Sequence, residues 1–324
     1  MTAATGRRYR VGAVVEQQAL PAAEVCDRAV LAEKLGMESL WMVQLPNQRD
    51  IATMLAGLAT CTRSATIGAA ILPVYTRPAV TMAHTAMTLD ELSGGRFILG
   101  LGLGHRGIGD WMFGMGAAPP AVASMREYLG IVTGLVRDGE VSSDGNWFSG
   151  HSSCPDMRRP GMPIYLGAFG PRMLELAGEL ADGAILWMCS PRYVREHAMP
   201  ALRRGWARRP GGADGFEVVA VLNAAVTEHP ADDIEGFRRY LNMFLRVSTY
   251  RTLFEVSGYG DCVKAGVPSD AMISDLAAIG PPELIAERLA EYVRAGATEV
   301  AVAPTVTVHQ SQDRFAETLA GGLA

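Results

Sequence analysis

The sequence has few cysteines and lacks the common short motifs of metal and nucleophile chemistry. Its 324 residues include five cysteines, which lie far apart, and no two of them have the CxxC spacing. This pattern favours buried or free thiols over a disulfide framework or a zinc site. No GxSxG or HExxH motif occurs, so we expect no nucleophile set of that kind and no metal. The five cysteines are Cys26, Cys61, Cys154, Cys189 and Cys262.

The chain also lacks a basic run and a long apolar run. The formal net charge is −5, and without a basic cluster we expect no nucleic-acid partner. No apolar stretch reaches the roughly 18 residues that a membrane span needs, so no membrane partner is expected. The basic start leads only into the short apolar run Val11–Val15, which is too brief for a signal-peptide core. These features predict a cytoplasmic protein.

A strand–helix–strand pattern occupies the stretch Thr66–Gly109. The apolar run Ile67–Leu72 precedes a helical pattern over Pro78–Leu92, and a second apolar run covers Phe97–Leu101. Such a unit predicts two parallel strands joined by a crossover helix. A glycine-dense loop follows, and glycines beyond a strand allow backbone to approach a ligand closely. The glycines are Gly100, Gly102, Gly104, Gly107 and Gly109.

Eight candidate strands alternate with helices along the whole chain. This pattern predicts an α/β protein with a (β/α)8 TIM barrel, as one domain over residues 1–324. A doubly wound open sheet is the alternative, and it usually has fewer strands. The strands are Tyr9–Val15, Ser39–Val43, Ile67–Leu72, Phe97–Leu101, Pro163–Leu166, Ala184–Trp187, Phe216–Val226 and Glu299–Ala303.

Three insertions are expected in this barrel. A glycine- and proline-rich connection follows strand four, and the segment 138–160 after helix four has extended pieces around Val141 and Trp147-Phe148. After strand seven, helical material is expected over 232–254, followed by a glycine-broken helical region over Tyr259–Ala278.

Two polar side chains follow strands directly and would lie on the catalytic face of a barrel. Glu16 follows the first strand and His105 follows the fourth. Taken alone, a residue of either kind is more often solvated at the surface than catalytic. The segment Gly102–Gly107 fits GxGxxG, but the glycines and prolines after it are incompatible with the helix that a dinucleotide site needs. We therefore interpret it as a flexible loop.

The segment Gly167–Arg172 is a better anion site. It joins a strand to a helix whose first residue is Pro171, so free N–H groups and the positive end of the helix dipole would face the loop. Arg172 could add a charge-assisted contact. An ordinary glycine turn is the alternative. Trp187 could be core or a wall beside a planar ring.

Three long motifs together resemble one family. They are TLDELSGGRFILGLGLG (Thr88–Gly104), MREYLGIVTGLVRDGEV (Met125–Val141) and PIYLGAFGPRMLELAGELADGAI (Pro163–Ile185). They are similar to the bacterial luciferase-like oxidoreductases over roughly 10–186. The resemblance implies an enzyme with a TIM barrel that binds FMN or the deazaflavin coenzyme F420 at the strand C-termini. Members of this family are often homodimers, so the resemblance also implies a homodimer.

The start RVGAVVEQQALPAAE resembles the F420-dependent glucose-6-phosphate dehydrogenase branch. In this resemblance Glu16 falls on an active-site glutamate, and no cation is expected beside it. Two positions depart from the pattern of that branch. His105 stands where the branch has a second acidic residue, and Gln44-Leu45 stand where it has an acid-histidine pair. Ala70-Ile71 matches a non-prolyl cis peptide that supports the middle of the cofactor ring.

The resemblance and the motifs together predict an F420-dependent oxidoreductase that transfers a hydride between the deazaflavin C5 and a small organic substrate. Glu16 would be the proton donor or acceptor, with His105 as the second candidate. The alternatives are an FMN-dependent monooxygenase fed by a separate reductase, and a non-catalytic binding barrel that has lost the chemistry. The expected cofactor-binding residues are Gln44, Ala70, Ile71, Gly104, Gly167, Ala168, Phe169, Gly170, Pro171, Arg172, Trp187 and Met188.

Overall fold

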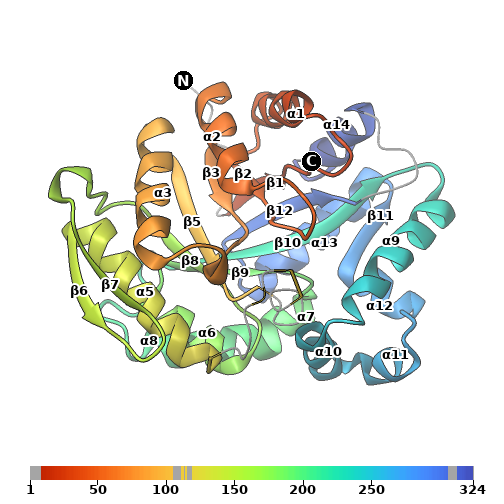
Figure 1. Cartoon of the computed structure of the whole chain (residues 1–324). Helices are drawn as coiled ribbons and strands as arrows, with labels where there is room; N and C mark the ends of the chain where they lie inside the picture. The colour runs from red at the N-terminus through yellow and green to blue at the C-terminus, as the bar shows by residue number, and fades with distance from the viewer. Residues whose placement is uncertain (1–8, 105–110, 113, 115–118, 306–311, 324) are drawn as a thin grey trace.

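The computed structural model describes residues 9–104, 111–112, 114, 119–305 and 312–323. A ring of strands lies at the centre of the molecule, and helices cover its outside (Figure 1). The main helices are α1 (Ala22–Lys34), α2 (Ile51–Cys61), α3 (Ala79–Leu92), α5 (Ala121–Asp138), α6 (Pro171–Leu180), α7 (Pro191–Tyr193), α8 (Met199–Trp206), α9 (Pro230–Phe244), α10 (Ser248–Phe254), α11 (Gly260–Ala265), α12 (Asp270–Leu276), α13 (Pro282–Ala295) and α14 (Gln312–Gly321).

Eight parallel strands in the described part of the chain close into a barrel. Each pairs with the next in the order given below, and the last pairs with the first, so the predicted (β/α)8 fold is confirmed. All eight predicted strands are present, and no end differs from the prediction by more than three residues. They are β1 (Arg10–Val14), β2 (Ser39–Met42), β3 (Thr66–Ala69), β5 (Phe97–Gly102), β8 (Ile164–Gly167), β9 (Gly183–Leu186), β10 (Glu217–Val226) and β12 (Glu299–Pro304).

A ninth strand, β11 (Ala277–Gly280), lies on the edge of β10 outside this ring. The helical prediction for the start of this segment was wrong. β9 pairs only with the first half of β10, Glu217–Ala220, and β11 pairs with the second half from Asn223 to Val226. The four buried residues of β11 pair with the part of the β10 edge that β9 leaves open. A run this short carries too little periodicity to be recognised from sequence.

The segment after α5 forms an antiparallel hairpin of β6 (Glu140–Asp144) and β7 (Ser149–Ser153). The extended piece predicted around Val141 is present. Trp147 and Phe148, which were expected to be extended, lie instead at the turn, so that prediction was wrong. The carboxylate of Glu127 accepts hydrogen bonds from the backbone N–H groups of Asn146, Trp147 and Phe148 at 3.1, 2.8 and 3.0 Å. Three hydrogen bonds to one carboxylate fix the turn against α5.

Side chains fill the interior of the barrel. Trp41 from β2 and Tyr165 from β8 are buried there, with ring centroids 6.2 Å apart. Smaller apolar side chains from the remaining strands complete this inner cluster. The barrel is therefore a packed core and not a pore, as expected for eight strands.

A charged network closes the amino-terminal end of the barrel. Glu299 is fully buried, and its Oε1 accepts hydrogen bonds from Trp41 Nε1 at 2.6 Å and Ser39 Oγ at 2.5 Å. Its Oε2 lies 3.0 Å from a guanidinium nitrogen of Arg10, which also lies 3.4 Å from Glu217. Burial raises the pKa of the Glu299 carboxyl, and Arg10 opposes that shift. The Arg10 cation thus compensates a carboxylate that has little access to water.

No helix among the described residues combines the length and the apolar character required to cross a bilayer.

Candidate functional site

A bulge interrupts the third barrel strand at its carboxyl end. β3 pairs with β5 through Gly68 and Ile98, and the strand resumes as β4 (Leu72–Pro73), where Leu72 pairs with Leu101. Four residue steps on one strand therefore oppose three on the other, which is the definition of a bulge. The peptide between Ala70 and Ile71 is cis, as predicted. The bulge presents Ala70 and Ile71 at the mouth of the barrel.

Three glycines make room for this bulge. A Cβ at Gly102 would lie 2.7 Å from Ile71 Cδ1, and a Cβ at Gly167 would lie 2.9 Å from Ile71 Cγ2. At Gly100, a Cβ would lie 1.8 Å from the carbonyl oxygen of Ala69. Close approach to a ligand was expected of this glycine-rich segment; Gly100 accommodates the protein's own chain, whereas Gly102 both accommodates Ile71 and lines the cavity. Gly104, with a φ of 65°, lines the cavity above them.

A cavity of about 1230 Å³ opens at the carboxyl ends of the strands. The structure brings most of the predicted cofactor-binding residues together in its wall. The loops after β2, β3, β5, β8 and β9 all contribute, which is the usual place for a ligand in this fold. The predicted residues in the wall are Gln44, Ala70, Ile71, Gly104, Gly167, Ala168, Phe169, Gly170, Pro171, Arg172 and Trp187.

The amino terminus of α6 reaches this cavity. Gly170 is its N-cap and Pro171 its first residue, and no side chain in the described part of the chain caps it. The N–H groups of Met173 and Leu174 bond to the carbonyl of Gly170 at 3.1 and 2.9 Å. The start of the helix and the exposed Arg172 together place positive potential at this side of the cavity. This geometry suits the predicted anion site.

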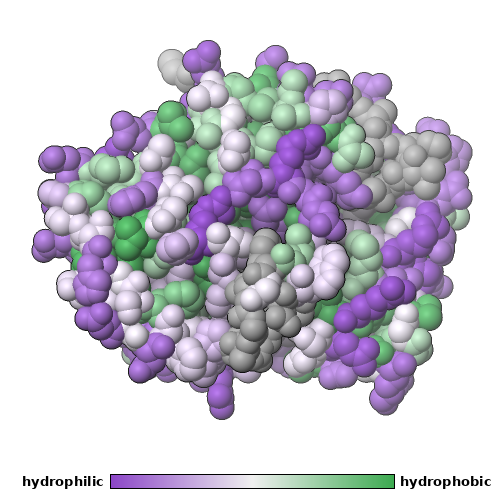
Figure 2. Space-filling model, in the orientation of Figure 1, coloured by the Kyte–Doolittle hydropathy of each residue, from purple (hydrophilic) through white to green (hydrophobic). Residues whose placement is uncertain are grey.

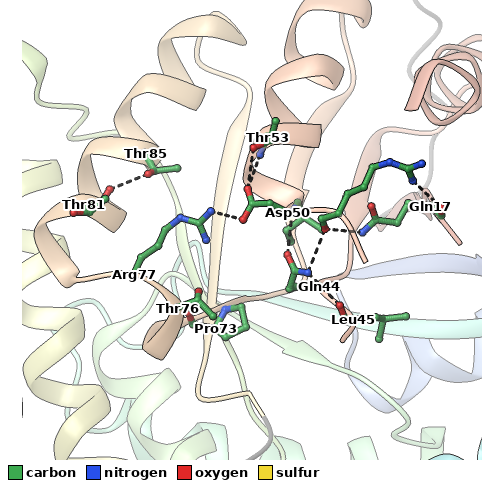
Figure 3. Close-up of polar contacts among 12 residues, drawn as sticks. Gln17, Gln44, Leu45, Asp50, Thr53, Pro73, Thr76, Arg77, Thr81 and Thr85 are labelled. Carbon is green, nitrogen blue, oxygen red and sulfur yellow. Dashed lines mark hydrogen bonds and ion pairs between the residues drawn. The ribbon is translucent and has the colours of Figure 1, made fainter. Parts of the chain in front are cut away.

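Gln44 organises the loop after β2. Its Nε2 donates to the carbonyls of Leu45 and Arg49, each at 3.2 Å, and its Oε1 accepts from the N–H of Ile51 at 3.0 Å. Figure 3 shows the side chain between the loop and the start of α2. Gln44 lines the cavity, but its amide is engaged with the loop. Its direct contact with a cofactor ring stays a prediction.

Two predicted residues that the structure describes, Glu16 and Met188, are not among the residues that line the cavity. Glu16 is half-buried and is not among the described residues of the cavity wall. Burial lowers the pKa of Arg28 and Glu16 raises it, so a cation lies within electrostatic reach of Glu16, contrary to expectation. Met188 is buried beneath the wall, with its Sδ 3.7 Å from Asn223 Nδ2. His105 lies outside the described residues.

Two groups of cavity residues were not expected from the sequence. Asp50 and Arg77 form an ion pair in the wall. Each stands shortly before a helix, in a loop after a strand, so the reasoning that selected Glu16 and His105 could have found them. Phe244 and Tyr250, from α9 and α10, form an aromatic wall with Phe169; the Tyr250 centroid is 4.7 Å from Phe244 and 5.3 Å from Phe169. Nothing in their helical pattern distinguished these two from core residues.

A band of hydrophilic side chains crosses one face of the molecule. Figure 2 shows hydrophilic side chains gathered in a band across the part of the molecule that Figure 1 colours red and orange. In the ranges that the structure describes, no group of three or more histidine, cysteine, aspartate or glutamate side chains is arranged to hold a metal ion. The chemistry offered by the cavity is therefore that of a mostly apolar site with a few polar and charged groups.

Comparisons with known proteins agree with this geometry. The family model described as luciferase-like monooxygenase matches residues 7–299. A 5,10-methylenetetrahydromethanopterin reductase of Archaeoglobus fulgidus is 30% identical over 290 residues, covering 83% of this chain and 86% of the relative.

Two solved structures share the fold. The coenzyme F420-dependent tetrahydromethanopterin reductase from Methanopyrus kandleri matches with a TM-score of 0.77 at 21% identity, over 97% of both chains. An F420-dependent secondary alcohol dehydrogenase, solved with an F420-acetone adduct, matches with a TM-score of 0.80 at 17% identity, over 98% of this chain and 99% of the other.

Proposed function

The chain belongs to the luciferase-like monooxygenase family of enzymes, and from this premise we propose that it is an oxidoreductase dependent on coenzyme F420. It would transfer a hydride between the deazaflavin C5 and a small organic substrate. The observation that carries the proposal is one cavity that joins a bulged floor at Ala70-Ile71 to the uncapped start of α6. A Mycobacterium tuberculosis relative that is 26% identical over 308 residues, covering 84% of this chain and 88% of the relative, is named a putative coenzyme F420-dependent oxidoreductase, which supports F420 over FMN.

The residues present fit such a cofactor. The cavity is large enough for a tricyclic ring and a second small molecule. Ala70 and Ile71 would support the face of the ring, and Trp187 would bound it. The start of α6 and Arg172 would hold the phosphate through the helix dipole and the charge of the guanidinium. When bound, the deazaflavin supplies a hydride donor or acceptor.

The chain's own residues would bind, orient and exclude water. The aromatic side chains of Phe169, Phe244 and Tyr250 make an apolar wall, which favours exclusion of solvent from the reacting centre. Glu16, at the end of β1, would give or take the proton on the substrate. His105 stays the second candidate for that role.

The cofactor is tested by titrating the purified protein with F420 and, separately, with FMN while tryptophan fluorescence is followed. We expect F420 to bind with a Kd in the micromolar range or tighter, which corresponds to about −8 kcal/mol or better. If FMN binds clearly more tightly under the same conditions, the proposal is wrong and a flavin monooxygenase takes its place. Failure of both to bind would indicate a barrel that has lost the chemistry.

The floor of the cavity gives a second test. Gly102→Ala places a methyl group against Ile71, whose side chain must then move. We expect F420 affinity to fall about tenfold, or about 1.4 kcal/mol. The double variant with Ile71→Ala should recover most of that loss, because the added methyl group then has space. Gly130→Ala is the control, since a Cβ there meets nothing within 4 Å. A Gly102→Ala protein with unchanged affinity would place the ring elsewhere.

A further inference from the structure

The charged residues of the cavity wall are unevenly distributed. Among the described residues of that wall, three are charged: Arg172 at the start of α6, and Asp50 and Arg77 after β2 and β4. In the order of the barrel, β5 lies between these two sectors. Arg172 has no acidic neighbour among the ion pairs of the described chain. One side of the cavity therefore carries an uncompensated cation, and the other carries an ion pair.

Both carboxylate oxygens of Asp50 are engaged. Oδ1 accepts from the backbone N–H of Thr53 at 2.9 Å and from its hydroxyl at 3.1 Å, and Oδ2 binds the guanidinium of Arg77. Figure 3 shows Arg77 pointing toward the start of α2, where Asp50 caps the helix. Burial acts to raise the pKa of Asp50, but the hydrogen bonds from Arg77 and Thr53 outweigh it and lower that pKa. Asp50 is thus ionised at neutral pH and cancels the charge of Arg77.

The pair is held in place by its surroundings. The carbonyl of Arg77 accepts a hydrogen bond from the hydroxyl of Tyr128 at 2.9 Å. The loop before Asp50 is fixed by Gln44, as described above. Arg77 is 19% exposed at the side chain and Asp50 is 41% exposed. Both side chains line the cavity, and the ion pair holds them together.

We infer that the Asp50–Arg77 side of the cavity selects an uncharged, largely apolar substrate, and that Asp50 determines this specificity by neutralising Arg77. The inference rests on the proposed function, which assigns the Arg172 side to the phosphate of the cofactor and leaves this side to the substrate. A ligand carboxylate that entered here would compete with Asp50 for the guanidinium of Arg77. The negative charge of Asp50 would also repel that carboxylate. An uncharged molecule meets Tyr75, Leu103 and Pro46 without that penalty.

The test is a double-mutant cycle that removes the charges of Asp50 and Arg77, measured on the protein without cofactor. Asp50→Asn removes the negative charge and keeps the helix cap, since asparagine is an equally good N-cap. Arg77→Gln removes the positive charge, and the double variant removes both. The probes are 2-naphthamide and 2-naphthoate, which differ mainly in charge, and binding is followed by fluorescence. The wild type should bind the amide more tightly, with a Kd below about 1 mM.

Asp50→Asn should tighten naphthoate binding about tenfold and change naphthamide binding by less than about twofold. Arg77→Gln should weaken naphthoate binding, and the double variant should resemble the wild type. Asp270→Asn is the matched control, because it removes an Asp–Arg pair with Arg238 at the start of α12, away from the cavity. It should leave the preference unchanged.

Three results would overturn the inference. They are a wild type that binds naphthoate at least as well as naphthamide, an Asp50→Asn protein with unaltered preference, and a wild type that binds neither probe. Thermal unfolding of every variant separates a charge effect from a loss of folding. The titration with F420 is independent of these probes. If F420 binds but the mutant cycle does not give the expected preferences, only the inferred substrate class is wrong. If F420 does not bind, the proposed function is wrong.

Discussion

Arg10→Met is expected to destabilise the protein by about 3 kcal/mol, because it leaves the buried carboxylate of Glu299 without its cation. We place the effect at the low end for a buried pair because the Arg10 side chain is 34% exposed. The double variant Arg10→Met with Glu299→Gln should be clearly more stable than the single variant, since no charge then remains to be buried. Urea unfolding at neutral pH measures both.

The destabilisation should also depend on pH. Burial raises the pKa of Glu299 above its unfolded value of about 4.3, and removal of Arg10 raises it further. The stability that protonated Glu299 contributes is present below the unfolded pKa and is lost as pH rises through the folded pKa. The gap in stability between Arg10→Met and the double variant should therefore widen from pH 4 to pH 8. An equal gap at both pH values would contradict this account of the network.

Glu16→Gln is expected to slow turnover about 100-fold while F420 affinity changes by less than about threefold. The amide keeps the shape of the side chain but cannot give or take the substrate proton. Steady-state kinetics on a confirmed substrate measure the first effect, and the fluorescence titration measures the second. Glu24→Gln is the matched control, because Glu24 acts on the same Arg28 from helix α1. That variant should keep near-full turnover.

His105→Asn separates the two candidates for proton transfer. We expect a smaller effect than that of Glu16→Gln. Near-full turnover in Glu16→Gln, together with loss of activity in His105→Asn, would reverse the assignment. If neither substitution matters, the proton moves through solvent or through another residue.

Elements that follow a repeated local pattern could be predicted from the sequence. The eight strands followed from alternation of apolar runs with helices. The cis peptide at Ala70-Ile71 followed from the family resemblance, and nothing in its local sequence requires it. β11 could not be found, because its pairing depends on how much of β10 is left open by β9. That quantity exists only in the assembled barrel.

The site was predictable to the extent that it is made of loops after strands. Gly167–Arg172 reach the cavity for that reason, and Asp50 and Arg77 do so for the same reason. Their pairing depends on a contact across 27 positions in sequence, which local patterns do not encode. The cation near Glu16 was missed likewise, since Arg28 lies in the middle of α1 and not in the loop after β1.

The filled interior of the barrel makes the cavity a blind one. With Trp41 and Tyr165 packed beneath the bulge and the network around Glu299 closing the opposite end, nothing passes through the axis of the barrel. A molecule seated on Ala70-Ile71 would therefore leave by the same opening through which it arrived.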